Sequence, residues 1–223
     1  MELSILKQYV ILSINPERGR IMVDGVRFRY SLAGALLMDY LEKGEFLMEN
    51  KLIVPEFRKN GDLVHDFFAD IIAGSSKERK ISSWVRRLSN KSRFLFRETI
   101  NSLEKERILT IETRKFLNII PYKRYWLTDK RLRINLIEEL RGILLYGRQA
   151  ATKQRMLLGL IKTSEGYNIL VKEKGEKNLL RKKNSEFLKG DTISGEINQA
   201  IKETEAAIIA SVIASSVAAR GSH

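Results

Sequence analysis

Apolar residues recur every three or four positions along most of this 223-residue chain, the spacing that lines one face of an α-helix. Residues typical of helix boundaries punctuate the pattern: Asp62 and Asp129 each precede an apolar segment, and Gly74 and Gly147 follow the same two segments. Only three prolines are present to interrupt it. We therefore predict a mainly α fold, a single compact multi-helix domain over residues 1–219 with small β-hairpins.

The boundaries of the predicted elements follow from capping and turn residues. Ser31 is expected to cap the second helix, because its hydroxyl can accept a hydrogen bond from the first turn. Residues 21–30 stay ambiguous, with a turn at Asp24. Alternating apolar residues predict a small β-hairpin over 46–54. The predicted helices cover 3–14, 31–44, 62–74, 91–106, 129–147, 151–163 and 191–219, and a further helix opens at Ser82 or Ser83.

Residues 114–129, RKFLNIIPYKRYWLTD, read as two short strands joined at a tip. This stretch has more large apolar surface than any other loop-like segment. Apolar side chains with cations around them suit insertion into a membrane surface or contact with a partner. A hairpin packed on its own core is the alternative. The residues expected to make the contact are Phe116, Leu117, Ile119, Ile120 and Tyr122, and the flanking cations are Arg114, Lys115, Lys123 and Arg124.

The chain is strongly basic, with a net charge of +13 and a pI of about 9.9. Much of this charge is local, since residues 75–133 contain 17 Lys and Arg against 6 Asp and Glu. Such a surplus favours anionic partners: nucleic acid, anionic lipid or an acidic protein. A solvated basic surface that keeps the protein soluble is the alternative interpretation.

The absence of cysteine excludes disulfides, thiolate metal sites and lipid attachment to cysteine. The first residues lack the basic region and cleavage site of a signal peptide. The longest apolar run, 206–219, is too short to span a bilayer. We expect a cytoplasmic protein that attaches reversibly to the cytosolic face of a membrane. The last four residues, 220–223, look like the remnant of an expression tag.

Catalysis and metal binding have little support in the sequence. His65 is the only internal histidine, and a lone histidine without a partner in view is usually structural. Asp62, Asp66 and Asp70 repeat every four residues, but one carboxylate face without a loop ligand is typical of solvated surface or capping. Glycine-rich phosphate loops, nucleophile elbows and zinc spacings are absent from the sequence. We therefore predict a non-enzymatic protein without a cofactor or metal.

The predicted helix over 91–106 carries the clearest anion-binding signal. Arg93 and Arg97 lie one turn apart, so their guanidinium groups can converge on one anion. Arg86 and Arg87, in the preceding helix, are further candidates.

Two helices followed by a hairpin also describe a winged helix-turn-helix, and basic charge beside a wing favours DNA binding. The apolar tip argues against this alternative, because a wing that tracks phosphates should carry cations and small polar residues.

Several segments, in order along the chain, resemble the Golgi phosphoprotein 3 family. The likeness covers about residues 3–219, and the order and spacing of the segments carry it more than any single motif. The alanine-rich end of the chain also fits. The matching segments are LSILKQYVILSI, SLAGALLMDYLEKGEF, NGDLVHDFF, SSWVRRLS and LEKERILTIETRKFLNIIPYKRYWLTD.

This resemblance implies a mostly helical fold and a peripheral membrane protein. Eukaryotic members of the family bind phosphatidylinositol 4-phosphate and retain glycosyltransferases in the Golgi. The head-group pocket of the family uses a tryptophan, an arginine and a later basic pair, which fall here on Asp24, Ala33, Arg93 and Phe96. Only Arg93 is kept. The basic N-terminal tail of the eukaryotic members is absent from this sequence, and we expect a prokaryotic relative.

The leading prediction is a non-enzymatic protein that binds anionic phospholipid head groups through a basic site while the apolar hairpin enters the membrane interface. One alternative is an oligomeric interaction scaffold that uses the hairpin as a contact between copies. The second alternative is a winged-helix binder of nucleic acid. The residues predicted to meet the head group are Arg93, Arg97, Arg27, Arg29, Arg86 and Arg87, where Arg27 and Arg29 replace charge near the unmatched positions.

Overall fold

The computed structural model describes residues 3–49, 52–55, 59, 61–75, 79–117 and 119–189. Over this part of the chain the fold is mainly α, as predicted, with two small antiparallel hairpins. The predicted helix over 191–219 and the expected tag remnant, 220–223, lie outside the described residues. The helices are α1 (Ile5–Ser13), α2 (Gly25–Glu42), α3 (Leu63–Ala73), α4 (Ile81–Ser89), α5 (Ser92–Lys105), α6 (Lys130–Tyr146), α7 (Thr152–Thr163) and α8 (Lys174–Lys189), with a 3-10 turn η1 (Tyr167–Ile169). The strands are β1 (Phe46–Glu49), β2 (Leu52–Pro55), β3 (Leu109–Phe116) and β4 (Ile120–Leu127).

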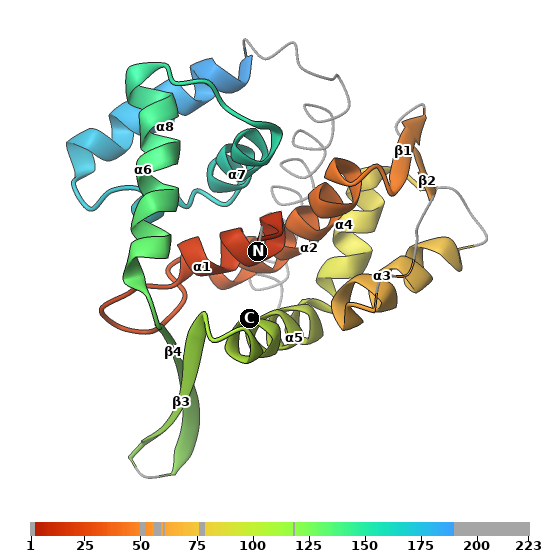
Figure 1. Cartoon of the computed structure of the whole chain (residues 1–223), viewed down its shortest axis with the longest axis horizontal. Coiled ribbons are helices and arrows are strands. Elements are labelled where there is room, and N and C mark those ends of the chain that lie inside the picture. Colours follow the sequence, from red (N-terminus) through yellow and green to blue (C-terminus); the bar gives the residue numbers. More distant parts are fainter. Residues whose placement is uncertain are drawn as a thin grey trace, which may run out of the picture.

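Helices α1 and α2 run through the middle of the molecule (Figure 1). Helices α6, α7 and α8 pack on one side of them, and α3, α4 and α5 lie on the other. The β3–β4 hairpin extends away from the helices. Helix α2 contacts α4, α5 and α7, and α1 contacts α5, α6 and α7, so these two helices together join the two groups.

The start of α2 corrects the prediction for residues 21–31. Asp24 is the N-cap, and its carboxylate accepts hydrogen bonds from the backbone N–H groups of Val26 and Arg27 at 3.0 and 3.3 Å. The Asp24–Gly25 pair that reads as a turn is therefore the helix start. Ser31 is not a cap; it lies inside α2 and is fully buried. The helix predicted over 31–44 lies mostly within α2, but α2 is buried on every side over 31–40, so its sequence lacks a one-sided apolar pattern.

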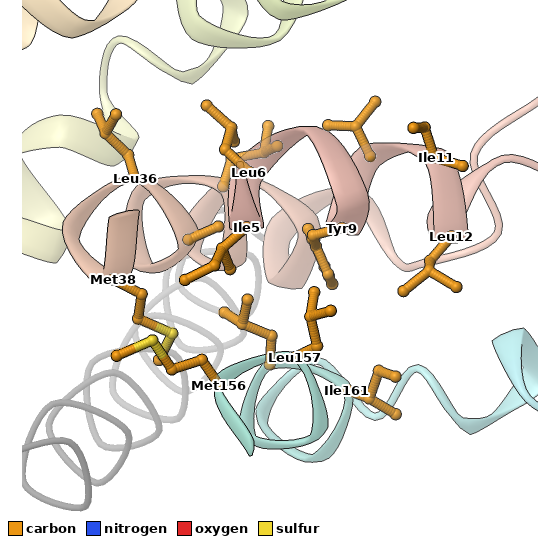
Figure 2. Close-up of a cluster of buried hydrophobic side chains, with 14 of the residues drawn as sticks. Ile5, Leu6, Tyr9, Ile11, Leu12, Leu36, Met38, Met156, Leu157 and Ile161 are labelled. Carbon is orange, nitrogen blue, oxygen red and sulfur yellow. The ribbon is translucent and has the colours of Figure 1, made fainter. Parts of the chain in front are cut away.

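The core lies between α1, α2 and α7. Figure 2 shows side chains of α1 and α2 pointing toward α7, where Met38 and Ile5 face Met156 and Leu157. All four are at most 2% exposed. Burial of these side chains is the main force that holds the helices together.

A buried carboxylate ties α1 to α2. Asp39 of α2 accepts the backbone N–H groups of Ile5 and Leu6 at 2.5 and 3.1 Å. These donors belong to the first turn of α1, which has no helical partner for them. Burial raises the pKa of Asp39 to about 6, against the opposing effect of these two hydrogen bonds.

The other predicted boundaries are mostly confirmed. Asp62 and Asp129 cap α3 and α6, and Gly147 closes α6 in the left-handed conformation with φ 66°. Helix α4 begins at Ile81, one residue earlier than the serines predicted to open it. Residues 174–189, KGEKNLLRKKNSEFLK, form the basic helix α8. The hairpin starts at Leu109, so it is longer than its apolar tip indicates.

Candidate functional site

The tip of the β3–β4 hairpin exposes a cluster of large apolar side chains. The strands pair with Phe116 opposite Ile120, so these two side chains lie together at the end of the ladder. Phe116 and Ile120 are 58% and 60% exposed, and Leu117 and Ile119 in the turn are 75% and 79% exposed. We call these four residues the apolar tip. The fold leaves them uncovered, although such side chains normally bury most of their surface.

Leu117 has a backbone conformation that a leucine rarely adopts. Its φ of 48° lies in the left-handed region, which glycine or asparagine occupies at lower cost. The strained residue holds an apolar side chain in solvent. Strain that presents a side chain outward points to a role for that side chain beyond the fold.

Cations surround the apolar tip on both faces of the hairpin. Arg114 and Arg124 share the face of Phe116, since they belong to alternate pairs of the ladder, and Lys115 and Lys123 share the other face. Arg114 pairs with Glu112 at 2.8 Å, which raises the pKa of the Arg114 guanidinium. Neither lysine forms an ion pair with a described residue. An anionic surface that meets the tip would therefore meet positive charge on either side.

Tyr122 differs from the other predicted contact residues. It is half-buried, and the guanidinium of Arg124 lies 4.9 Å from the centre of its ring. This contact belongs to the shaft of the hairpin below the apolar tip. Tyr122 therefore orients Arg124 and adds little exposed apolar area.

The base of the hairpin is fixed to α2 and α5 by edge-to-face contacts between aromatic rings. Phe96 of α5 packs edge-on against Phe28 of α2, with ring centroids 5.5 Å apart, and against Tyr125 of β4 at 5.4 Å. Phe96 occupies the position where the resemblance implies a basic head-group residue. The phenyl ring is partly buried and serves packing, so it cannot contact an anion directly.

The predicted pair Arg93 and Arg97 lies on α5, and both side chains are exposed. Arg97 is directed to its own helix: its guanidinium lies 5.4 Å from the ring centre of Phe94 and donates to Glu98 at 2.6 Å. This hydrogen bond lowers the pKa of Glu98. Arg93 forms no ion pair with any residue that the structure describes. An anion would therefore find Arg93 available and would compete with Glu98 for Arg97.

The two predicted arginines of α2 lie on different sides of the helix. Arg29 donates to the hydroxyl of Ser92 at 3.2 Å, next to Arg93. Arg27 lines a separate pocket beside Glu165 and Asn168. Arg29 thus joins the α5 arginines, whereas Arg27 does not.

The predicted residues Arg86 and Arg87 lie in the last turn of α4. They line another pocket, of about 420 Å³. The guanidinium of Arg87 is 5.8 Å from the ring centre of the buried Trp84. Sequence reasoning missed the residues that complete this pocket, which come from α2, from the residue pair before α4 and from α4 with its C-cap. These residues are Tyr30, Arg79, Ser83 and Asn90.

His65 is buried, and two carboxylates contact its ring, although the sequence showed no partner for it. Its Nδ1 lies 2.9 Å from Asp66, and its Nε2 bonds to Glu45. The His65 backbone carbonyl accepts the hydroxyl of Tyr40 at 2.7 Å. Both ring nitrogens are thus occupied. Asp62 caps α3 and Asp70 pairs with Lys59, which agrees with capping and solvated-surface roles.

Two properties of the described residues bear on the kind of site that this surface offers. No group of three or more His, Asp or Glu residues there is arranged to hold a metal ion. None of the helices in this part of the chain is both long and apolar enough to cross a membrane.

The fold and surface define a class: a mainly α protein with an apolar hairpin tip, surrounding cations and nearby exposed arginines. The particular family follows from comparison. The chain belongs to the Golgi phosphoprotein 3 (GPP34) family, whose model matches residues 5–204. A comparison with curated proteins gives no significant match. The predicted resemblance is thus confirmed, and membership points, for the family as a whole, to interaction with phospholipid membranes.

Proposed function

We propose that this protein is a non-enzymatic peripheral membrane protein that binds anionic phospholipid on the cytosolic face of a membrane. The apolar tip enters the interface, while Arg29, Arg93 and the cations of the hairpin meet the head groups. One observation carries the proposal: four large apolar side chains stand exposed at the end of a hairpin that has cations on both faces. Family membership supports the same function.

The energetics favour reversible attachment. Each basic residue near an anionic membrane contributes about 1 kcal/mol, and this contribution falls with salt. Each large apolar side chain that is fully buried contributes about 1.5–3 kcal/mol. The tip residues are already partly covered, so each contributes less than this range. The sum suits binding that salt or loss of anionic lipid reverses.

Cosedimentation with vesicles tests this function. The protein should bind vesicles of phosphatidylcholine with phosphatidylglycerol more strongly than vesicles of phosphatidylcholine alone. The double variant Ile119→Asp, Ile120→Asp should lose this binding. Ile134→Asp with Leu179→Asp is the matched control, because these side chains are exposed, at 48% and 45%, on helices α6 and α8. Equal binding to both vesicles, or equal losses in both double variants, would contradict the proposal.

The exposed tip also supports a second function, an interaction scaffold in which two copies bury their hairpin tips together. Light scattering separates the two functions. A mass that falls to that of a monomer in the Ile119→Asp, Ile120→Asp variant, without vesicle binding by the parent protein, would favour the scaffold.

A further inference from the structure

We propose that the pocket between α2 and α4 binds the phosphate group of a phosphate ester. Its lining combines three arginines with three neutral hydrogen-bonding side chains. This proposal deepens the proposed function and rests on it only for the membrane source of the ligand. The six residues, which we call the arginine pocket, are Tyr30, Arg79, Ser83, Arg86, Arg87 and Asn90.

The charges of the arginine pocket are unbalanced. Among the residues that the structure describes, no carboxylate lines the pocket, and none forms an ion pair with Arg79, Arg86 or Arg87. Three like charges around one cavity repel each other. The C-terminal end of α4 offsets part of this repulsion for Arg86 and Arg87, which lie in its last turn, but Arg79 precedes that helix. A bound anion would offset the remaining repulsion between the three arginines.

The donors of the arginine pocket match phosphate better than a small halide. A guanidinium presents several N–H groups in a planar fork that fits two oxygens of one phosphate. The hydroxyls of Tyr30 and Ser83 and the amide of Asn90 can donate to further oxygens. The cavity, of about 420 Å³, has room for a phosphate with part of its esterified alcohol.

Two arginines are held in place before any ligand arrives. Arg87 lies over the ring of Trp84, a residue that is 2% exposed and therefore fixed in the core. Arg79 donates through Nε to the hydroxyl of Ser75 at 3.4 Å, and its terminal nitrogens form no hydrogen bond with a described residue. Less rotamer entropy is then lost on binding.

The arginine pocket is separate from the positions that the family resemblance assigns to the head group. Those positions are Asp24, Ala33, Arg93 and Phe96, and none lines the pocket. Tyr30, which lines the pocket, follows Arg29 directly in α2. A phosphate bound here would come from a lipid head group or from a soluble phosphate ester.

Calorimetric titration of the full chain with glycerol 3-phosphate and with inorganic phosphate tests the pocket. The double variant Arg86→Gln, Arg87→Gln should bind glycerol 3-phosphate at least about tenfold more weakly, since charge-assisted fork contacts are lost. Arg79→Gln alone should weaken it in the same direction. Lys182→Gln with Lys183→Gln is the matched control: it removes the same charge from exposed positions of α8 and should change the affinity less than about twofold.

Vesicles identify the source of the phosphate. If a lipid supplies it, the Arg86→Gln, Arg87→Gln variant should lose preference for phosphatidic acid over phosphatidylglycerol in phosphatidylcholine vesicles. If a soluble ester supplies it, glycerol 3-phosphate binding should depend on the pocket while vesicle binding does not. The pocket stands if either dependence is seen.

The failures of the two proposals are distinguishable. The arginine pocket is overturned if Arg86→Gln, Arg87→Gln changes neither glycerol 3-phosphate binding nor lipid preference. It is also overturned if the control variant loses as much affinity. In both cases hairpin-dependent vesicle binding can still stand. If the parent protein binds no vesicles but binds glycerol 3-phosphate in a way that depends on the pocket, the membrane function is overturned and the pocket stands.

Discussion

Tyr125 donates its backbone N–H to the carbonyl oxygen of Gly19 at 2.8 Å, which joins the projecting hairpin to the loop between α1 and α2. The ring of Tyr125 contacts Phe96 on α5 at the same level. The hairpin is thus fixed at its base from two directions. A fixed base lets an exposed tip keep a constant orientation relative to the arginines of α2 and α5.

Substitution of Gly19 should loosen this attachment. Gly19 has φ 59°, and a Cβ there would lie 3.1 Å from the Trp126 ring and 3.2 Å from Arg124. We expect Gly19→Ala to lower the free energy of unfolding by about 1–3 kcal/mol, through backbone strain and displacement of Trp126. Urea denaturation measures the loss, and faster amide exchange at Tyr125 should accompany it.

Gly25→Ala is the control for Gly19→Ala, because its Cβ would meet no atom within 4 Å and its φ is not positive. Its stability should stay within about 0.5 kcal/mol of the parent. If both alanine variants lose stability equally, the close approach at Gly19 is not the cause.

The ring contact between Phe96 and Tyr125 should appear as an energetic coupling. In a double-mutant cycle with Phe96→Leu and Tyr125→Leu, we expect about 0.5–1.5 kcal/mol of coupling in the free energy of unfolding. Phe67→Leu with Tyr125→Leu is the control cycle, because the Phe67 ring contacts Phe68 and Phe94 instead. Additive losses in the first cycle would show that the hairpin base does not depend on this ring pair.

How far the sequence predicts this fold is clear from the two aspartates that cap α3 and α6. Asp62 and Asp129 stand before one-sided apolar patterns, so local signals define both helix starts. Helix α2 lacks such a signal, because it is buried all round and its Asp24–Gly25 start has the composition of a turn. The helix predicted over 31–44 therefore overlaps α2, and only its start at Gly25 was missed.

The residues of the candidate site also differ in how far the sequence predicts them. The apolar tip is contiguous in sequence. Its side chains are exposed because the end of the hairpin has too few neighbouring residues to cover them. The arginines depend on tertiary packing: Arg27 and Arg29 are two residues apart yet lie on different surfaces, and Tyr30 of α2 lines the same pocket as Arg86 of α4. Helical spacing predicts the relative directions of side chains only within one helix. Contacts between side chains of different helices could therefore not be predicted.

Arg133 should contribute strongly to stability. Its buried guanidinium donates to the carbonyl oxygen of Leu12 at 3.1 and 3.2 Å and to that of Ile169 at 3.4 Å, which joins α6 to α1 and η1. Burial lowers its pKa. We expect Arg133→Met to cost about 2–4 kcal/mol in urea denaturation, because two buried carbonyl oxygens lose their donor.

Arg131→Met is the matched control for Arg133→Met, since Arg131 lies two residues away with a side chain that is 85% exposed. Its stability should change by less than about 1 kcal/mol. A loss as large as that of Arg133→Met would mean that charge or helix propensity, and not the buried contacts, explains the effect.

Asp39 should make stability depend on pH in the direction opposite to most carboxylates. Its pKa is about 6 in the folded protein, above the ordinary 3.8, because burial disfavours the charged form. The folded carboxyl then keeps a proton that the unfolded chain releases, so the free energy of unfolding falls as pH rises through this window. The contribution is complete below the lower pKa and is lost above the higher one, with a total of at most about 3 kcal/mol.

The variant Asp39→Asn isolates this effect, because asparagine does not titrate and the other carboxyls cancel in the difference between the two proteins. Urea denaturation at about pH 4 and about pH 7 should show the parent more stable relative to Asp39→Asn at the lower pH. Asparagine can accept only through its single oxygen, so one of the N–H groups of Ile5 and Leu6 loses its acceptor in the variant at both pH values. A difference that stays constant with pH would show that the two donors balance the effect of burial on Asp39, and one that grows as pH rises would show that they outweigh it. Either result would contradict the prediction.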